Sequence, residues 1–554
     1  MQQSAESRVV PHPRDRVAHF LEKGLWSQTP TAERFHSIAG RFGSRTAVID
    51  PRDSITYRQL DRRSDQVALS MLSSGIRPGD PILFQVGNSV AAVVAWYGVL
   101  KAGALPVATL AGHRGHEISH IAELVGAVGH IVDDSQPQRF DMVDFAREQA
   151  RISGTLTHLF TVGGDASLTR TGVSRIEELG SSIEPDAGRL PIEAVQSDIG
   201  PQDVAVYQLS GGTTGVPKVI PRLHGEYWNN GRAWAQALGR NEHSVTCHAG
   251  PFIHNAGITC GLHGTHSVGG CLVLPPPDKT VALQMMSEHH VNDTIFGHGM
   301  FSWIMSEEYP PAAEHLRTVI LSGAKVPNEV FTRVERFGAW VGQSFGMGEG
   351  LFTLTPLTSP RDLRARTVGT PLTADDEIRI LDPNGENEVP DGVVGELACR
   401  GWYTIPGYLA SAEHNAVAFT ADGFYRTGDR GRIEVHDEQR YLSIEGRIKD
   451  LINRGGEKIN AEELEILLRQ HASVDDVAVV AMPDATLGER VCAYLVIVGH
   501  APTIPDVQDH LEALGVAKYK WPERIEIIDA LPRTQVGKID KKALRSDITE
   551  KLST

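Results

Sequence analysis

The segment from Ser210 to Lys218 is rich in groups that bind phosphate, and an apolar stretch, Val204–Leu209, leads directly into it. Glycines let backbone N–H groups approach an anion, hydroxyls donate hydrogen bonds, and a lysine adds positive charge. The segment is not a Walker A loop, because the pattern GxxxxGK[ST] is absent. A Gly-Thr turn between two strands is the alternative interpretation. The candidate phosphate-binding residues are Ser210, Gly211, Gly212, Thr213, Thr214, Gly215 and Lys218.

Three charged residues lie in other short motifs that contain glycine. Glu349 lies in Phe345-Gly-Met-Gly-Glu-Gly350, where a carboxylate among small and apolar neighbours is costly unless it is paired. Asp429 ends the turn Arg426-Thr-Gly-Asp429, and capping of that turn is the alternative role. Lys538 follows a glycine near the end of the chain, where a solvated surface lysine is the alternative.

The surrounding pattern alternates short apolar strands with helical stretches, which predicts an α/β fold with largely parallel sheets. From about Lys449 onward the pattern changes to that of a compact α+β unit. The predicted strands are 46–50, 81–86, 128–133, 155–162, 204–209, 477–482 and 491–498, and the predicted helices are 90–100, 461–471 and 507–514.

Composition excludes several classes of protein. The 554 residues include 53 Lys and Arg against 69 Asp and Glu, a net charge of −16 that disfavours a nucleic-acid-binding surface. Five scattered cysteines without CxxC spacing favour a reducing cytoplasm over a disulfide framework or a zinc site. No signal peptide is visible at the start, and the longest apolar run, 90–100, is too short to span a bilayer. We therefore expect a cytoplasmic protein that does not bind membranes.

The order of the motifs resembles that of the adenylate-forming enzymes, which include acyl- and aryl-CoA synthetases, peptide-synthetase adenylation domains and firefly luciferase. The resemblance runs from Ser54-Ile-Thr-Tyr57 to Lys538 and is strongest to stand-alone aryl-acid ligases that activate 2,3-dihydroxybenzoate or salicylate for siderophore assembly. The signatures are Leu100-Lys-Ala-Gly-Ala-Leu-Pro-Val107, the phosphate loop, Phe345-Gly-Met-Gly-Glu349, Gly395-Glu396, Tyr425-Arg-Thr-Gly-Asp429, Gly446-Arg-Ile-Lys-Asp450 and Gly537-Lys538.

The resemblance implies a large, multi-subdomain N-terminal adenylation body, residues 1–448, and a small mobile α+β cap, residues 449–554. It also implies that the protein uses ATP and Mg²⁺. Glu349 would then hold the metal, and Lys538 would bridge the carboxylate of the acid and the α-phosphate of ATP. Asp429 resembles the residue that binds the ribose hydroxyls, and Arg447 its partner at the ribose or phosphate. The implied walls of the adenine site are Ser322-Gly323-Ala324-Lys325 and Ser344-Phe345-Gly346, with Met347 also expected at the nucleotide. For Lys325 a purely structural role is about equally favoured.

The cap is expected to rotate between the two half-reactions. Lys449 occupies the family's hinge position, with Asp450 beside it, and Gly455 and Gly456 would line a tunnel for the incoming thiol. Because the chain ends at Thr554, soon after Lys538, we expect the thiol in trans, as the phosphopantetheine of a carrier protein or as coenzyme A. The resemblance to siderophore ligases favours a carrier protein. A catabolic aryl- or acyl-CoA synthetase and an adenylate-binding protein without turnover are the alternatives.

The segment Pro251–Cys260 resembles the aryl-acid pocket motif of the family. His254 resembles the aromatic gate to the thiol tunnel, Asn255 the amide that binds the substituent ortho to the carboxyl, and Cys260 a position where Cys favours salicylate. Ala256 stands where the family usually has a bulky aromatic residue, which opens space beside the substrate ring. Ser344 stands where the family usually has Val, which adds a hydroxyl there. Gly323 is also expected beside the ring. We therefore predict a 2-hydroxy- or 2-aminobenzoate substrate, with salicylate, 2,3-dihydroxybenzoate and 3-hydroxyanthranilate as candidates.

Overall fold

The computed structural model describes residues 8–135, 141–164, 171–183, 189–210, 217–323, 326–382, 385–454, 457–484, 487–514, 516, 518–534 and 537–553. The chain divides into two compact units by the density of its internal contacts. The first unit comprises Met1–Ile378 and Cys399–Tyr425, and the second comprises Arg379–Ala398 and Arg426–Thr554.

One sheet of the first unit leads to the predicted phosphate loop. Its strand order is β7-β6-β5-β3-β4-β8-β9, and its strands pair in parallel except at the β8–β9 edge. The strands are β3 (Pro81–Gln85), β4 (Leu105–Val107), β5 (Gly129–Asp133), β6 (His158–Val162), β7 (Ser174–Arg175), β8 (Val204–Leu209) and β9 (Val219–Leu223). The accompanying helices are α3 (Tyr57–Ser73), α4 (Val90–Lys101), α5 (Gly115–Val125), α6 (Met142–Ser153) and α7 (Leu190–Ser197).

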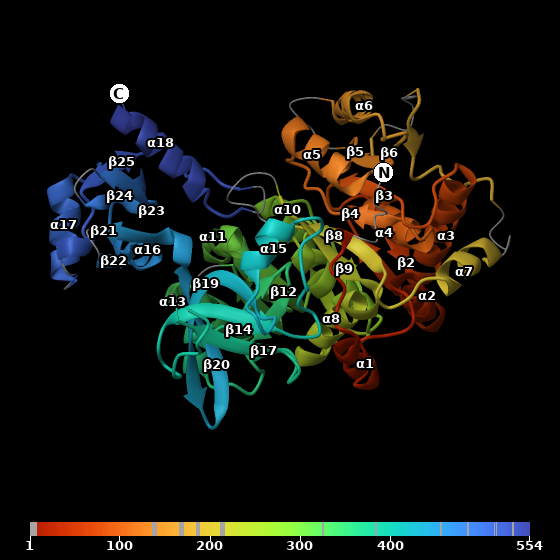
Figure 1. Ribbon diagram of the computed structural model, residues 1–554. Helices are drawn as coiled ribbons and strands as arrows, with labels where there is room; N and C mark the ends of the chain where they lie inside the picture. Colours follow the sequence, from red (N-terminus) through yellow and green to blue (C-terminus); the bar gives the residue numbers. More distant parts are fainter. Residues whose placement is uncertain are drawn as a thin grey trace. The chain divides into compact units, whose positions relative to one another are not determined.

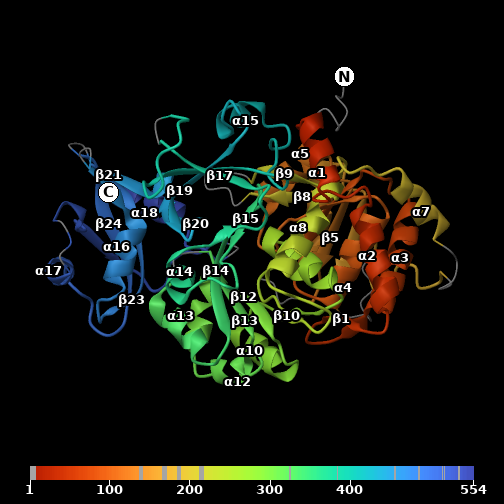
Figure 2. The ribbon, with the colours of Figure 1, turned by 90° about the horizontal axis from the view of Figure 1, so that it is seen from below.

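A second sheet of the first unit has the order β16-β15-β14-β13-β12-β10-β11-β1-β2, with parallel pairing from β14 to β1 and antiparallel edges. Figure 2 shows helices α10, α12 and α13 beside β12, β13 and β14. The strands are β1 (Thr46–Ile49), β2 (Ser54–Thr56), β10 (Val245–Cys247), β11 (Cys271–Val273), β12 (Asp293–Gly297), β13 (Thr318–Ser322), β14 (Trp340–Met347), β15 (Leu351–Leu354) and β16 (Thr370–Pro371), and the helices are α10 (Lys279–Glu288), α11 (Phe301–Met305), α12 (Tyr309–Ala313), α13 (Asn328–Glu335) and α14 (Arg361–Arg366).

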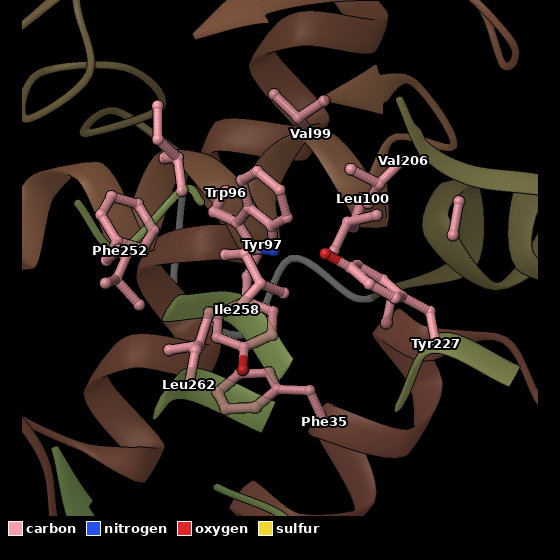
Figure 3. Packing of buried hydrophobic residues seen from close by; sticks show 14 of the residues in the cluster. Phe35, Trp96, Tyr97, Val99, Leu100, Val206, Tyr227, Phe252, Ile258 and Leu262 are labelled. Carbon is pink, nitrogen blue, oxygen red and sulfur yellow. The ribbon is translucent and has the colours of Figure 1, made fainter. Parts of the chain in front are cut away.

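The largest hydrophobic core of the first unit surrounds α4, which is buried on all sides because nearly every residue in it is apolar. Phe35 stacks on Tyr97 with the ring centroids 3.8 Å apart, and Trp96 meets the edge of Phe252 at 6.2 Å (Figure 3). The remaining helices of this unit are α1 (Arg14–Glu22), α2 (Thr31–Phe42), α8 (His224–Ala237), the π-helix η2 (Gly257–His263), α9 (Gly264–His266), the 3₁₀ turn η3 (His298–Met300) and α15 (Ala412–Ala418).

Most of the second unit consists of two sheets, the first with the order β17-β18-β19-β20 and the second with the order β22-β21-β24-β23, where β25 joins β24 in parallel (Figure 1). The strands are β17 (Glu377–Leu381), β18 (Gly395–Arg400), β19 (Tyr425–His436), β20 (Gln439–Arg447), β21 (Leu451–Arg454), β22 (Glu457–Asn460), β23 (Val474–Asp484), β24 (Gly488–Ile497) and β25 (Arg524–Ile527). The helical segments are η4 (Ile448–Asp450), α16 (Ala461–Leu468), α17 (Ile504–Ala513), η5 (Lys518–Lys520) and α18 (Lys541–Ser553).

The α/β fold class with largely parallel sheets is confirmed, and β8 has the predicted bounds. Strand β6 begins at His158, three residues later than predicted, and α16 ends at Leu468 instead of His471. The segment after Leu468 forms a turn in which the Val474 N–H donates to the His471 carbonyl, leading the chain into β23. None of the helices that the structure describes has the length and apolar character needed to cross a membrane.

A buried lysine fixes α3 against α4. The ammonium of Lys101 is inaccessible to solvent and lies 2.6 Å from Asp61 Oδ1 and 2.7 Å from Asp65 Oδ1. It also donates to the backbone carbonyl of Asp61 at 2.7 Å. Two carboxylates and a carbonyl therefore replace the water that this cation loses on burial.

We expect Lys101→Met to lower the free energy of unfolding by about 3–5 kcal/mol, because it removes the buried cation between two poorly hydrated carboxylates. Among the residues that the structure describes, Asp61 then keeps only His36, and Asp65 only Arg189, as a partner. Urea denaturation followed by tryptophan fluorescence measures this loss.

Arg151→Met is the matched control, since it removes a surface pair with Glu148 and is expected to cost less than about 1 kcal/mol. Equal losses in the two variants would contradict the assignment.

Candidate active site

The two ends of the predicted phosphate loop are held together. The Ser210 N–H donates to the Lys218 carbonyl at 2.9 Å, and the Lys218 N–H donates to Ser210 Oγ at 3.0 Å. Directly before and after them, Leu209 of β8 pairs with Val219 of β9. The predicted residues Gly211, Gly212, Thr213, Thr214 and Gly215 lie outside the described residues.

Lys218 and Glu349, predicted from separate motifs, both contact Tyr408. The Lys218 ammonium is 5.1 Å from the centroid of the Tyr408 ring and 3.0 Å from His414 Nε2. The Tyr408 hydroxyl donates to Glu349 Oε1 at 2.7 Å and lies 2.8 Å from the Tyr425 hydroxyl. The structure thus places a cation and a carboxylate in one cluster, which we call the Tyr408 cluster.

Electrostatics define the protonation of this cluster. Partial burial lowers the pKa of Lys218, and the nearby Glu349 carboxylate opposes that shift. Burial and the Lys218 charge lower the pKa of His414, so near neutral pH its imidazole is uncharged and accepts a hydrogen bond from the ammonium. Burial, followed by the Glu349 charge, raises the pKa of Tyr408, which therefore remains a hydrogen-bond donor. The cluster thus contains a lysine beside a neutral imidazole and a protonated phenol beside a carboxyl group.

Backbone contacts fix the turn that carries Glu349. Gly350 adopts φ +107°, and a Cβ at this position would lie 1.9 Å from the Tyr403 carbonyl oxygen, so only glycine fits. The Ile405 N–H donates to the Glu349 carbonyl at 2.9 Å, and Thr404 Oγ1 donates to the Gly350 carbonyl at 2.8 Å. The segment 403–405 therefore sets the position of the Glu349 backbone.

The predicted adenine walls are neighbours in the sheet. Ser322 of β13 pairs with Ser344 of β14, and Ser322 Oγ donates to the Ser344 carbonyl at 3.0 Å. Gly323 follows with φ +98°, a conformation that favours glycine. Carboxyl ends of adjacent parallel strands form the usual ligand edge of an α/β sheet. Phe345, Gly346 and Met347 complete β14 at this edge, whereas Ala324 and Lys325 lie outside the described residues.

One of the predicted aryl-acid residues, Asn255, is a buried amide. Asn255 is 4% exposed, accepts a hydrogen bond on Oδ1 from the Tyr403 hydroxyl at 3.1 Å, and donates from Nδ2 to the Met347 carbonyl at 3.5 Å. Met347 belongs to the predicted adenine wall, so the two predicted subsites meet at this residue. Of the other predicted acid-site residues, His254 is exposed, Ala256 is half-buried, and Cys260 and Ser344 are buried.

Asn255 stands at the entry to a π-helix, a local widening that occurs frequently at functional sites. Its carbonyl accepts a hydrogen bond from Thr259 Oγ1 at 2.7 Å. A Cβ at Gly257 would lie 2.3 Å from the Phe252 carbonyl oxygen, which explains why glycine follows Ala256. Figure 3 shows Ile258 among the packed core residues, so the π-helix is anchored in the hydrophobic interior.

The structure also contains a buried ion pair, between Arg222 and Glu226, that was not predicted from the sequence. Arg222 of β9 donates to Glu226 Oε2 at 2.7 Å, to the Gly348 carbonyl at 3.0 Å and to the Tyr403 carbonyl at 2.6 Å. Its guanidinium carbon lies 3.7 Å from the centroid of the Tyr403 ring. The signal for this pair was a lone arginine within the apolar run Val219–Leu223, four residues before a glutamate.

The second unit holds the predicted ribose residues. Asp429 of β19 pairs with Arg447 of β20, and Arg447 Nε lies 2.8 Å from Asp429 Oδ1. Asp450, predicted at the hinge, lies in η4, where its carboxylate accepts a hydrogen bond from Arg545 at 3.1 Å. The side chain of Lys449 and the residues Gly455 and Gly456 lie outside the described part.

Lys538 closes a tight turn in the second unit. The Thr534 N–H donates to the Lys538 carbonyl at 2.6 Å, and the Gly537 N–H donates to the Thr534 carbonyl at 2.8 Å. Gly537 adopts φ +79°, which explains the glycine before the lysine. The side chain of Lys538 is exposed.

Comparison with known proteins identifies the family. Residues 35–409 match the AMP-binding enzyme family, and residues 463–538 match the AMP-binding enzyme C-terminal domain. A salicylyl-CoA synthase / salicylate adenylyltransferase from a Streptomyces species is 39% identical, with 98% of each chain covered. The salicyl-AMP ligase / salicyl-S-ArCP synthetase of Mycobacterium tuberculosis is 36% identical over 97% of this chain and 94% of the relative.

A solved structure is similar to this chain in both sequence and fold. The apo structure of MbtA from Mycobacterium smegmatis has 36% sequence identity and a TM-score of 0.73, and the match covers 98% of this chain and 100% of that one. The resemblance predicted from the ordered motifs is thereby confirmed. The chain belongs to the AMP-binding enzyme family, as an adenylate-forming ligase similar to the aryl-acid–AMP ligases.

Proposed function

We propose that this chain activates a benzoic acid carrying a hydroxyl or amino group ortho to its carboxyl. The carboxylate oxygen attacks the α-phosphorus of ATP, the bond from that phosphorus to the bridging oxygen of pyrophosphate breaks, and an aryl adenylate forms. A phosphopantetheine thiol then attacks the acyl carbon, AMP leaves, and the thiol proton is released. The product is an aryl thioester on a carrier protein, in siderophore or secondary-metabolite biosynthesis.

The observation that carries the first half-reaction is the Tyr408 cluster, because it joins the lysine of the phosphate loop to the carboxylate of a second motif. Lys218 would bind phosphate oxygens, and Glu349 would hold Mg²⁺. Bound Mg²⁺ neutralises phosphate charge and commonly takes one or two protein carboxylates, with the remaining ligands from phosphate and water. Glu349, a single carboxylate in the same cluster as Lys218, fits that role.

Residues of the second unit complete the proposal. Asp429 would bind the ribose hydroxyls, Arg447 the ribose or a phosphate, and Lys538 the carboxylate and the α-phosphate as they approach. Positive charge placed between two reacting anions is expected to supply most of the catalysis. Lys449 and Asp450 would be the hinge, and Gly455 and Gly456 would border the thiol path.

The acid would bind at Asn255, beside the small side chain of Ala256 and the buried Cys260 and Ser344. A buried amide, thiol and hydroxyl suit a polar aromatic acid better than an alkyl chain. The names of the relatives point to salicylate and support an ortho-substituted benzoate. His254 would be the gate towards the thiol.

The thiol acceptor has two candidates. The mycobacterial relative is named for transfer to a carrier protein, whereas the Streptomyces relative is named for coenzyme A. We propose the carrier protein, and free coenzyme A is the alternative. Timed reactions of preformed adenylate with coenzyme A and with phosphopantetheinylated carrier proteins distinguish them, and faster transfer to coenzyme A would favour the alternative.

For the metal role, we expect Glu349→Gln to raise the Mg²⁺ concentration that gives half-maximal ATP–pyrophosphate exchange by at least about tenfold, since a neutral amide binds Mg²⁺ poorly. Glu148→Gln, which removes an exposed carboxylate of α6, is the control and should leave the Mg²⁺ dependence unchanged. An unchanged Mg²⁺ dependence in Glu349→Gln would place the metal elsewhere.

For the substrate, we expect ATP–pyrophosphate exchange to be fastest with a member of the 2-hydroxy- or 2-aminobenzoate set. The panel consists of benzoate, salicylate, 2,3-dihydroxybenzoate, anthranilate, 3-hydroxyanthranilate and octanoate. A highest rate with benzoate or octanoate would refute the proposed acid class.

For the catalytic lysine, we expect Lys538→Ala to reduce pyrophosphate exchange about 10²–10³-fold while ATP binding is largely preserved, because the charge acts mainly in the transition state. Lys542→Ala, at the neighbouring exposed lysine of α18, should retain the exchange rate. Isothermal calorimetry measures ATP affinity in both variants. Equal activity in the two variants would assign Lys538 to the solvated surface.

A further inference from the structure

A histidine of α15 contacts the lysine that follows the predicted phosphate loop. His414 is 196 residues away from Lys218 in the chain, yet its Nε2 lies 3.0 Å from the Lys218 ammonium. An ammonium has donors and no acceptor, so the imidazole nitrogen accepts this hydrogen bond. The fold therefore gives this lysine a neutral partner.

Backbone contacts set the position of that partner. Asn415 of α15 accepts a hydrogen bond from the Tyr408 N–H at 2.9 Å and donates to the Tyr408 carbonyl at 3.0 Å. The next residue, Leu409, donates its N–H at 3.0 Å to the carbonyl of Val219, the first residue of β9. These hydrogen bonds fix the start of α15, and with it His414, against the strand that begins directly after the lysine.

Tyr408 gives Lys218 and Glu349 separate contacts. The face of its ring lies 5.1 Å from the ammonium, whereas its hydroxyl donates to Glu349 Oε1 at 2.7 Å. Burial lowers the pKa of Lys218 and the Glu349 charge acts in the opposite direction, so the two side chains attract each other. The lysine nevertheless donates to His414, and in the described part of the chain no ion pair joins it to Glu349.

Keeping these two side chains apart favours the binding of a nucleotide. If they paired, the lysine would have to leave the carboxylate before it met phosphate, and the carboxylate would have to leave the lysine before it met Mg²⁺. A lysine that is already held also loses less rotamer freedom when a ligand binds. An ammonium carries three hydrogens, so two remain for phosphate oxygens while one stays on the imidazole.

We propose that His414 is a positioning residue, whose neutral imidazole holds the Lys218 ammonium away from Glu349 and in place for the phosphates of ATP. This rests on the proposed function, in which Lys218 binds phosphate and Glu349 binds Mg²⁺. In this role His414 acts through Lys218.

The first test measures KM for ATP and kcat in ATP–pyrophosphate exchange. In His414→Leu the KM for ATP should rise about five- to tenfold, the scale expected when one long side chain must be immobilised on binding. The kcat should change less than about twofold, because the lost contact affects binding more than chemistry. His414→Gln should keep KM within about twofold of the wild-type value, because its amide oxygen can accept from the ammonium. Equal effects of leucine and glutamine would indicate a packing role and overturn the inference.

Glu413→Leu is the matched control, because it places the same side chain at the neighbouring exposed position of α15 and should leave KM unchanged. The Lys218→Ala background supplies a second control. Since the imidazole acts through the ammonium, His414→Leu should raise KM no further once the lysine is absent, whereas additive effects would overturn the inference.

The outcomes separate this inference from the proposed function. A raised KM in Lys218→Ala with a wild-type KM in His414→Leu would overturn the inference and leave the phosphate role of Lys218 intact. An unchanged KM in Lys218→Ala would refute that phosphate role, and this inference with it.

The tautomer of His414 tests the contact in the wild-type protein and remains decisive if His414→Leu does not fold. Accepting at Nε2 requires the neutral imidazole to carry its proton on Nδ1. Long-range ¹H–¹⁵N spectra of the ¹⁵N-histidine-labelled protein at neutral pH should show this tautomer, with the His414 signals assigned by their loss in His414→Gln. A protonated ring, or a proton on Nε2, would overturn the inference.

Discussion

The guanidinium of Arg222 is enclosed in the first unit, and the geometry of the candidate site depends on it. A buried cation is costly unless its charge is paired and most of its N–H groups find acceptors. In Arg222 the two Nη groups find acceptors, whereas the buried Nε has none in the described part of the chain. Here Glu226 supplies the opposite charge, while the carbonyls of Gly348 and Tyr403 accept further hydrogen bonds. Because these acceptors come from distant segments, satisfying one arginine requires β9, the turn before Glu349 and the segment at Tyr403 to meet.

That requirement connects two chemical tasks. Gly348 directly precedes the carboxylate proposed for the metal, and Tyr403 holds the amide proposed for the acid. The close approach of Gly350 to the Tyr403 carbonyl locks the two segments a second time. A displacement at either place would reach the other through backbone contacts, since packed interiors transmit strain. We infer that the phosphate and acid ends are positioned as one rigid piece of the first unit.

The sequence was most informative where the signal is local. The apolar run before the glycines gave the bounds of β8, and the composition of Val90–Lys101 gave a buried helix. Ser210, Lys218, Glu349 and Asn255 could be selected by residue type within short motifs. Tyr408 and Tyr403 could not, because their partners lie 59 and 148 residues away in the chain and an isolated tyrosine carries no pattern. The partners of the Asn255 amide likewise come together only on folding.

The contrast between Gly257 and Ala256 separates what the proposed acid site must keep from what it can change. Gly257 abuts the Phe252 backbone, so any side chain there would deform the π-helix that carries the amide. Ala256 is only half-buried, and a change in its size would alter the space beside Asn255 without that clash. Such an arrangement is evolvable: successive substitutions at one position can reshape the cavity for differently substituted rings while the main chain and its polar contact are inherited unchanged.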